Sequence, residues 1–206
     1  MTGRIIIDIF STLDGVAQAP GGPQEDTSGG FRFGGWQEPV SDDVVGEEIR
    51  AGLDNVDALL LGRLTYDIWA DYWPHHTAAP IGALFARLPK YVASRGKPQL
   101  DWDGSTLLGP DLASEVEALR ERHENIHVIG SIDLVQSLLA DELYDELNLW
   151  VFPLVLGEGK KVFPTGAAPA TLRLLAPPVV ATTGAVLLRY GPAGAVVLGD
   201  MTQHEE

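Results

Sequence analysis

The sequence predicts an α/β fold in three layers, in which a mixed and mostly parallel sheet carries helices on both faces and an antiparallel edge near the C-terminus. Through the middle of the chain, short apolar segments alternate with amphipathic segments, as in parallel strands joined by crossover helices. Near the end, strand-like segments follow one another with no helix between them, which is typical of antiparallel strands. No repeat or linker divides the chain, so residues 1–206 are expected to form one domain, with a disordered tail at 201–206.

The first strand is expected at residues 4–10, where β-branched and aromatic residues predominate. The Gly- and Pro-rich stretch at residues 11–41 contains interleaved aromatic residues, so a functional lid and an Ω-loop packed on its own side chains are both open. Ser41 is expected to cap a helix whose apolar residues recur every four positions. Further helices are expected at residues 63–72, 81–88, 111–123 and after Ser131, and further strands at 58–61, 90–94, 106–108, 126–129, 146–153, 171–175 and 186–190.

Composition excludes several classes of function. The chain has 14 Lys and Arg against 29 Asp and Glu, and a net charge of −15 disfavours binding to nucleic acid or to an anionic membrane. The absence of cysteine excludes disulfides, thiolate nucleophiles, zinc–thiolate sites and iron–sulfur clusters. No signal peptide or membrane-spanning segment is apparent, so a cytoplasmic location is expected.

Familiar catalytic signatures fail when their spacing is checked. The segment at residues 157–161 lacks the first glycine and the hydroxyl of a phosphate-binding loop, and Val162 occupies the third glycine position of a dinucleotide fingerprint. The adjacent pair His75 and His76 has no partner ligands at suitable spacing, so no metal site is expected.

Polar groups at the ends of three predicted strands give the strongest functional signal. One strand ends at Gly62 and Arg63, another at Ser94 and Arg95, and a third at Gly130–Ser131. Carboxyl ends of parallel strands share one edge of the sheet, and helix N-termini with arginines there favour a phosphate-bearing ligand. The alternative is that both arginines are surface residues paired with nearby acids. A dinucleotide is the better reading because all three strand ends carry phosphate-binding groups.

The order of several motifs resembles the dihydrofolate-reductase-like family, and within it the reductase domain of riboflavin biosynthesis. Residues 62–66 (Gly-Arg-Leu-Thr-Tyr) after an apolar strand are similar to a G-R-x-T-aromatic segment of that family. Residues 11–15 (Ser-Thr-Leu-Asp-Gly) resemble its S-x-D-G start, and residues 153–163 resemble its P-x-x-x-G-x-G segment. The resemblance covers nearly the whole chain and implies NADPH as the hydride donor.

By this resemblance, Gly62 is part of the cofactor site and Thr65 contacts the pyrophosphate. The 2′-phosphate would be bound by Arg63 and by the pair Ser94 and Arg95. Gly130 and Ser131 would let the cofactor backbone approach the next helix. Folate reductases usually carry a second glycine where Ser131 stands, and a serine narrows the approach although its hydroxyl can replace an amide contact.

The substrate side has more than one reading at each position. The resemblance places Asp14 at the substrate pocket with a catalytic role, although Asp14–Gly15 is also a strong turn pair. Glu48 is the candidate acid of a folate-type site, or else a solvated residue on a helix surface. Trp36 and Tyr66 would form an aromatic wall that binds substrate, or pack as core under the loop.

The favoured function is an NADPH-dependent reductase acting on a pyrimidine-like or related heterocycle, with a small-molecule substrate and no nucleic-acid or membrane partner. A dihydrofolate reductase and a non-catalytic NADPH-binding protein are the alternatives. The apolar segment at residues 147–152 could pair across a dimer, and the resemblance also favours a homodimer.

Overall fold

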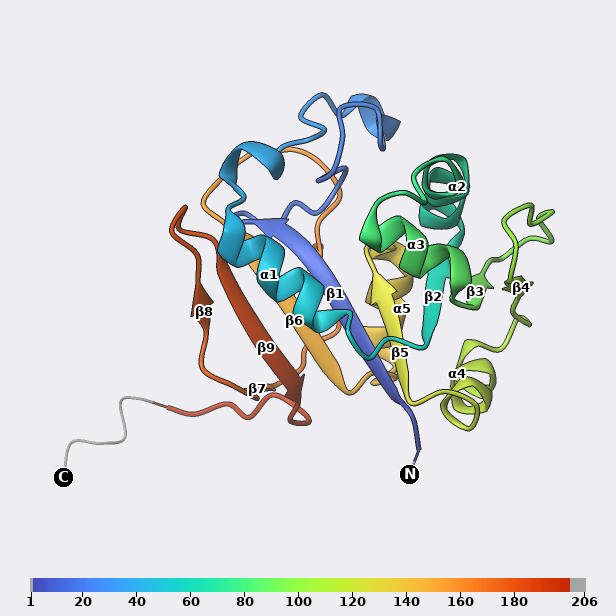
Figure 1. Ribbon diagram of the computed structural model, residues 1–206. Coiled ribbons are helices and arrows are strands. Elements are labelled where there is room, and N and C mark those ends of the chain that lie inside the picture. Colours follow the sequence, from blue (N-terminus) through green and yellow to red (C-terminus); the bar gives the residue numbers. More distant parts are fainter. Residues whose placement is uncertain (1, 201–206) are drawn as a thin grey trace.

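The chain forms a nine-stranded sheet with helices on both faces, in a computed structural model that describes residues 2–200 (Figure 1). The predicted tail at 201–206 lies outside the described residues. The strands are β1 (Arg4–Thr12), β2 (Ala58–Gly62), β3 (Lys90–Ala93), β4 (Ser105–Leu107), β5 (Asn125–Ile129), β6 (Glu146–Phe152), β7 (Leu172–Leu174), β8 (Val179–Val180) and β9 (Val186–Pro192). The helices are α1 (Asp43–Gly52), α2 (Arg63–Tyr72), α3 (Pro80–Arg87), α4 (Leu112–Arg120) and α5 (Ile132–Ala140), with 3-10 turns at Ser28–Gly30, Glu38–Val40 and Trp73–His75.

The strand order is β4-β3-β2-β5-β1-β6-β9-β7, and β8 also pairs with β9. Strands β1 to β6 are mutually parallel, whereas β7, β8 and β9 pair antiparallel, so the predicted mixed sheet with an antiparallel C-terminal edge is confirmed. Because β1, β2, β3 and β5 run the same way, their carboxyl ends meet at one edge, as the sequence predicted.

Alternating residues of the central strands separate the two helical layers. Ile5 and Ile7 of β1 pack in one cluster with residues of α4 and α5 such as Val116 and Leu138. The opposite face packs against α1, α2 and α3, with Phe85 of α3 among the buried residues. Figure 1 shows α1 lying across the front of β1 and β6. Within residues 2–200, no helix has the length and apolar character needed to cross a membrane.

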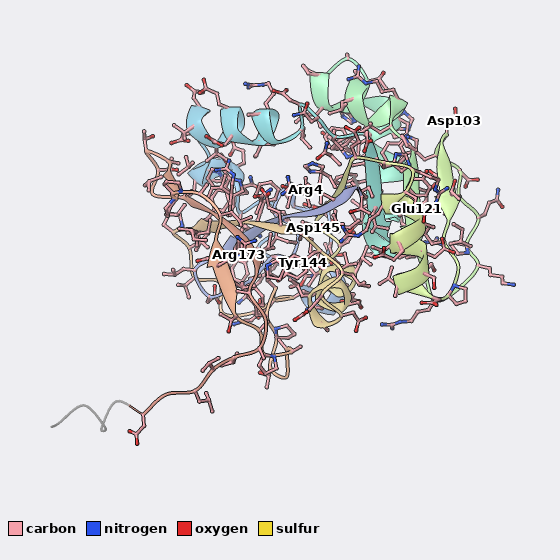
Figure 2. All side chains as sticks on the ribbon, turned by 90° about the horizontal axis from the view of Figure 1, so that it is seen from below. Arg4, Asp103, Glu121, Tyr144, Asp145 and Arg173 are labelled. Carbon is pink, nitrogen blue, oxygen red and sulfur yellow. The ribbon has the colours of Figure 1, made fainter. Side chains whose placement is uncertain are left out.

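The amino-end edge of the sheet is closed by charged groups, and Figure 2 looks onto it with Arg4 and Asp145 labelled near its middle. The Asp145 carboxylate accepts from Ile5 N at 2.7 Å and from Arg120 Nη1 at 2.6 Å. Arg4 donates to Glu146 at 2.7 Å. The Asp145 side chain therefore satisfies the backbone donor of Ile5 at this edge.

The cap of α1 differs from the prediction by one residue. Ser41 was expected to cap it, but Asp42 is the N-cap and accepts from Val45 N at 3.0 Å. The same carboxylate accepts from the hydroxyl and backbone of Thr182, and the Thr182 hydroxyl is the largest cause lowering the pKa of Asp42 to about 2. A carboxylate can serve these several donors at once, whereas a serine hydroxyl cannot. Asp42 thus ties α1 to the turn before β9.

The stretch after β1 packs on its own side chains, which fits the Ω-loop alternative. Phe31 and Trp36 are buried in one cluster with Phe152 of β6. The Trp36 indole donates to the Gln18 carbonyl oxygen at 2.8 Å. The loop also meets Gly159, where a Cβ would lie 2.8 Å from the Phe31 ring at a φ of +119°, so only glycine fits this approach.

The position of β6 removes the sequence argument for a dimer. Residues 147–152 were expected to offer a strand for pairing between copies, but β6 lies between β1 and β9 and has no free edge. Its alternate residues contact both layers: Leu147 packs with the α4–α5 side, and Trp150 packs under the loop. A homodimer stays a prediction that rests on the resemblance alone.

Lys90 begins β3 with a fully buried side chain. Its ammonium donates to the Asp103 carbonyl oxygen at 2.8 Å and lies 4.4 Å from the centroid of the Trp102 ring. Loss of hydration on burial lowers the pKa of Lys90 from 10.5 to about 8.

This burial predicts a pH dependence of stability. Between pH 8 and 10.5 the unfolded chain binds the Lys90 proton more tightly than the folded chain, so the free energy of unfolding should rise with pH across that window. The rise should be up to about 3 kcal/mol. Chemical denaturation at a series of pH values would measure it, and Lys90→Met should lose this rise while other groups titrate unchanged. An equal rise in the variant would contradict the assignment.

Candidate active site at the carboxyl edge of the sheet

The junctions β2–α2 and β5–α5 are joined directly at the carboxyl edge. Gly62 N donates to Ser131 Oγ at 2.8 Å, and a Cβ on Gly62 would lie 3.3 Å from the Ser131 Cβ. Gly130 N donates to the Asp8 carbonyl oxygen of β1 at 3.1 Å. The structure therefore brings together Gly62, Gly130 and Ser131, as the sequence predicted. The Ser131 hydroxyl is already used by Gly62, so it has a structural partner within the protein.

Helices α2 and α5 begin at this joint without side-chain caps. Neither Gly62 nor Ser131 makes a side-chain capping hydrogen bond, whereas α1 and α4 are capped by Asp42 and Asp111. Amide groups of an uncapped first turn point outward and attract an anion, aided by the helix dipole. Two such termini side by side form a suitable cradle for a pyrophosphate.

The backbone at the second junction is left-handed at two successive residues. Gly130 has a φ of +65° and Ser131 one of +60°, so the chain turns sharply before α5. A Cβ placed on Gly130 would find nothing nearer than the Thr65 side chain at 3.9 Å. Thr65 of α2 is thus a close neighbour of Gly130, at van der Waals distance from that position, where the resemblance implies a pyrophosphate contact.

The arginines at this edge differ in their partners. Gly62 pairs with Ala93 in the sheet, so residues 63 and 94–95 follow neighbouring strand ends. Arg63 Nε donates to the Asp67 carboxylate at 2.6 Å, which is the surface-pair alternative raised for it. Arg95 is exposed and has no hydrogen bond or ion pair with any residue in the described part of the chain. Ser94 Oγ accepts from Gly96 N at 3.1 Å.

Asp14 holds two segments of the chain together. Its carboxylate accepts from the Thr12 hydroxyl at 2.6 Å, from Gly157 N at 2.9 Å and from Leu156 N at 3.2 Å. The Thr12 hydrogen bond is the largest cause of a lowered pKa of Asp14, and burial opposes it. Two of the three segments that carried the family resemblance, around residues 11–15 and 153–163, therefore meet at this carboxylate.

The aromatic side chains expected at the substrate lie in the core. Trp36 and Tyr66 are 6% and 2% exposed. The Tyr66 hydroxyl accepts from Trp102 N at 3.0 Å. Neither ring lines the cavity between α1 and the sheet, so their placement fits the alternative in which both rings pack as core.

A cavity of about 210 Å³ lies between α1 and the sheet. Glu48 of α1 lines it and accepts from Arg189 of β9 at 2.6 Å, so this acid is ion-paired instead of solvated alone. Apolar walls come from Ile6, Phe10, Ile49, Leu53, Ile129, Trp150 and Leu187. The volume is below that of pockets that enclose drug-sized ligands, so it suits one small ring or one part of a larger molecule.

The floor of this cavity carries a polar cluster that sequence reasoning missed. Asp8 of β1 accepts from His127 Nδ1 of β5 at 2.7 Å and from Asn148 Nδ2 of β6 at 3.0 Å. The signal available in the sequence was Asp8, which interrupts a run of isoleucines. Burying polar residues at the centre of a helix-covered sheet face costs free energy. The cluster is therefore expected to have a functional or a structural role.

The cavity and the glycine junction share strands β1 and β5. Asp8 points its carboxylate into the cavity while its carbonyl oxygen holds the Gly130 amide. Ile129, a cavity wall residue, precedes Gly130 directly. A ligand in the cavity would therefore lie close to a second ligand bound at the β2–α2 and β5–α5 junctions.

Comparison with known proteins places these features in a family. A family model described as the RibD C-terminal domain matches residues 4–182. An uncharacterised protein of Bacillus subtilis strain 168, YyaP, is 28% identical over 165 residues, which make up 78% of this chain and 80% of that protein.

Solved structures show the same fold at low identity. A protein of Shewanella sp. PV-4 named after riboflavin biosynthesis superposes with a TM-score of 0.70 at 20% identity, covering 92% of this chain and 99% of that one. A pyrimidine reductase-like protein of Corynebacterium diphtheriae gives 0.60 at 12%, covering 93% and 92%. A Thermotoga maritima deaminase and 5-amino-6-(5-phosphoribosylamino)uracil reductase gives 0.61 at 14%, covering 93% of this chain and 57% of that longer one.

Proposed function

Because the chain belongs to the RibD C-terminal domain family, we propose that it is an NADPH-dependent reductase of a pyrimidine-like heterocycle. The observation that carries this proposal is the joint between β2–α2 and β5–α5, where two uncapped helix N-termini lie together beside Gly130. The family includes pyrimidine reductases, and its reductases typically use a nicotinamide cofactor.

The residues at the joint fit such a cofactor. The first-turn amides of α2 and α5, with Thr65, would bind the pyrophosphate, and Gly130 would let it approach because a glycine carries no side chain. Arg95 is the free cation at the neighbouring strand end within residues 2–200, and it would bind the 2′-phosphate that separates NADPH from NADH. Arg63 would assist as far as Asp67 releases it. Bound NADPH supplies a hydride with its electron pair.

The cavity beneath α1 is the candidate substrate pocket. It combines apolar walls with a few fixed polar groups, which is typical of sites for small planar ligands. Asp14 lies outside this lining and would act by fixing the segment at residues 153–163 beside the end of β1.

Turnover with two classes of substrate tests the proposal. NADPH oxidation should be seen with 5-amino-6-(5-phosphoribosylamino)uracil, whose ribosyl unit is unreduced, or with related aminopyrimidinones, and turnover should be weaker with NADH. NADPH oxidation seen only with dihydrofolate would instead support the folate-type alternative. In that case Glu48 must break its ion pair with Arg189 to act on the substrate. Tight NADPH binding with no turnover of either class would support a non-catalytic binding protein. Arg95→Ala is the matched control, because it should raise the KM for NADPH while leaving the substrate KM unchanged.

A further inference from the structure

The polar cluster of Asp8, His127 and Asn148 lines the cavity and has unused hydrogen-bonding capacity at Asn148 Oδ1 and His127 Nε2. We propose that His127, oriented by Asp8, donates the proton of the reduction, and that Asn148 Oδ1 accepts an N–H of the same substrate ring. This inference rests on the proposed reductase function and adds the residues that contact the substrate. It assigns a catalytic role to His127 and a positioning role to Asp8.

The orientation of the Asn148 amide follows from its partner. A carboxylate only accepts hydrogen bonds, so the Asn148 group that faces Asp8 at 3.0 Å is the NH₂ group. Asn148 Oδ1 is then directed away from Asp8, and it is buried with no hydrogen-bond partner among the described residues. A buried acceptor left without a donor costs about 1–3 kcal/mol, so a bound N–H group would relieve that cost. Asn148 lines the cavity from which such a group would come.

The Asp8 carboxylate also determines which nitrogen of the His127 ring carries the hydrogen. Its Nδ1 lies 2.7 Å from Asp8 Oδ2 and carries the hydrogen, because the oxygen can only accept. No residue in the described chain forms a hydrogen bond with His127 Nε2, and the ring lines the cavity. An imidazole with one nitrogen held by a carboxylate and the other directed at a ligand is the arrangement of a general acid or base.

The other charged groups facing the cavity leave Asp8 as the partner of His127. They form two pairs, Arg4 of β1 with Glu146 of β6 at 2.7 Å and Arg189 of β9 with Glu48 of α1 at 2.6 Å. Each cation is matched by its own carboxylate, whereas Asp8 has only neutral Asn148 and His127 as partners. Among the described residues that line the cavity, the Asp8 carboxylate therefore has no cation of its own and holds the His127 ring.

His127 Nε2–H gives its proton to the nitrogen of a C=N bond, or the oxygen of a C=O bond, while the carbon receives the hydride and electron pair from NADPH. The double bond becomes a single bond, and His127 is left neutral with Nδ1–H still bound to Asp8. Solvent then returns a proton to Nε2. The ligand class is a planar ring that carries a ring N–H beside its polar groups.

Ring ¹⁵N-labelled histidine provides a readout that does not depend on turnover. The probe is uracil, added to the full chain saturated with NADP⁺, and 1,3-dimethyluracil is the matched control because it has no N–H to donate. Uracil should shift the Nε2 resonance of His127, and the dimethyl compound should not. Asn148→Ala should abolish the uracil shift. Asp8→Asn should let the ring carry its hydrogen on either nitrogen, which the ¹⁵N shifts report directly.

A second variant separates catalysis from structure. His127→Gln can still donate an amide N–H to Asp8 but cannot deliver a proton, so uracil affinity should change only a few fold while turnover falls by roughly 10²–10⁴-fold. An unshifted His127 resonance with uracil, or equal shifts with both probes, would overturn the inference. So would a His127→Gln variant with wild-type turnover. If NADPH itself fails to bind the wild-type chain, the proposed function fails, whereas NADPH binding with no response at His127 removes this inference alone.

Discussion

Replacing Arg95 with alanine is expected to weaken NADPH binding by roughly 10–100-fold while NADH binding changes little, because a guanidinium–phosphate hydrogen bond contributes about 1.5–3 kcal/mol. Arg95 is exposed and lacks an ion-pair partner within residues 2–200, so no internal contact is lost with it. Calorimetric titration of both nucleotides into both proteins measures the four dissociation constants.

Arg63 supplies the matched comparison. Asp67 already holds the Arg63 guanidinium at 2.6 Å, so Arg63→Ala should cost less NADPH affinity than Arg95→Ala. Asp67→Asn should increase NADPH affinity, because it frees Arg63 and removes a negative charge near the phosphate. An equal loss of NADPH and NADH affinity in Arg95→Ala would contradict the assignment of this residue to the 2′-phosphate.

Replacing Asp14 with asparagine is expected to destabilise the fold by about 2 kcal/mol, or a fall of roughly 4–8 °C in Tm. The asparagine oxygen can keep the Thr12 and Leu156 donors, which share one carboxylate oxygen, but its NH₂ group would then face the Gly157 amide, donor against donor. The pKa of Asp14 is lowered from 3.8, so its contribution to stability is present above that pH and is lost as the pH falls below it.

Thermal melts at a series of acidic pH values test this role. The difference between wild type and Asp14→Asn should shrink as the pH falls below 3.8, since the unfolded chain then binds a proton that the folded carboxylate, with its lowered pKa, takes up only at lower pH. Glu158→Gln is the control in the same segment, where an exposed pair with Arg32 at 3.4 Å should contribute little. A fully stable Asp14→Asn variant that loses only turnover would show that Asp14 acts on the substrate and not through the fold.

Most of the fold could be predicted because its signals are local. The buried run before Gly62 and the alternation of strands and helices were enough to predict a parallel sheet with a shared carboxyl edge. The α1 cap was assigned one residue early because the preference for Asp42 comes from Thr182, which is distant in sequence. The place of β6 between β1 and β9 likewise depends on strand order, which local pattern does not encode.

The same distinction between local signals and long-range contacts applies to the candidate site. The junctions at Gly62 and Gly130 could be predicted because each follows a recognisable strand. The Asp8–His127–Asn148 cluster could not, because its members come from three strands far apart in the chain and meet only through sheet register. In the sequence, each of these three residues is only one polar residue within an otherwise mostly apolar strand segment. Burial of Trp36 and Tyr66 was also open, because it depends on packing between distant segments: Trp36 packs with Phe152 of β6, and Tyr66 packs with Phe85 and Trp102.

Calorimetric titration of the wild-type chain with NADPH, and in parallel with NADH, tests the central claim most directly. The two uncapped helix N-termini with Arg95 predict micromolar binding of NADPH, clearly tighter than that of NADH and weakened by salt. Absence of binding by either nucleotide would contradict the account, because the joint at Gly62, Gly130 and Ser131 would then be only a packing contact between two helices and the sheet.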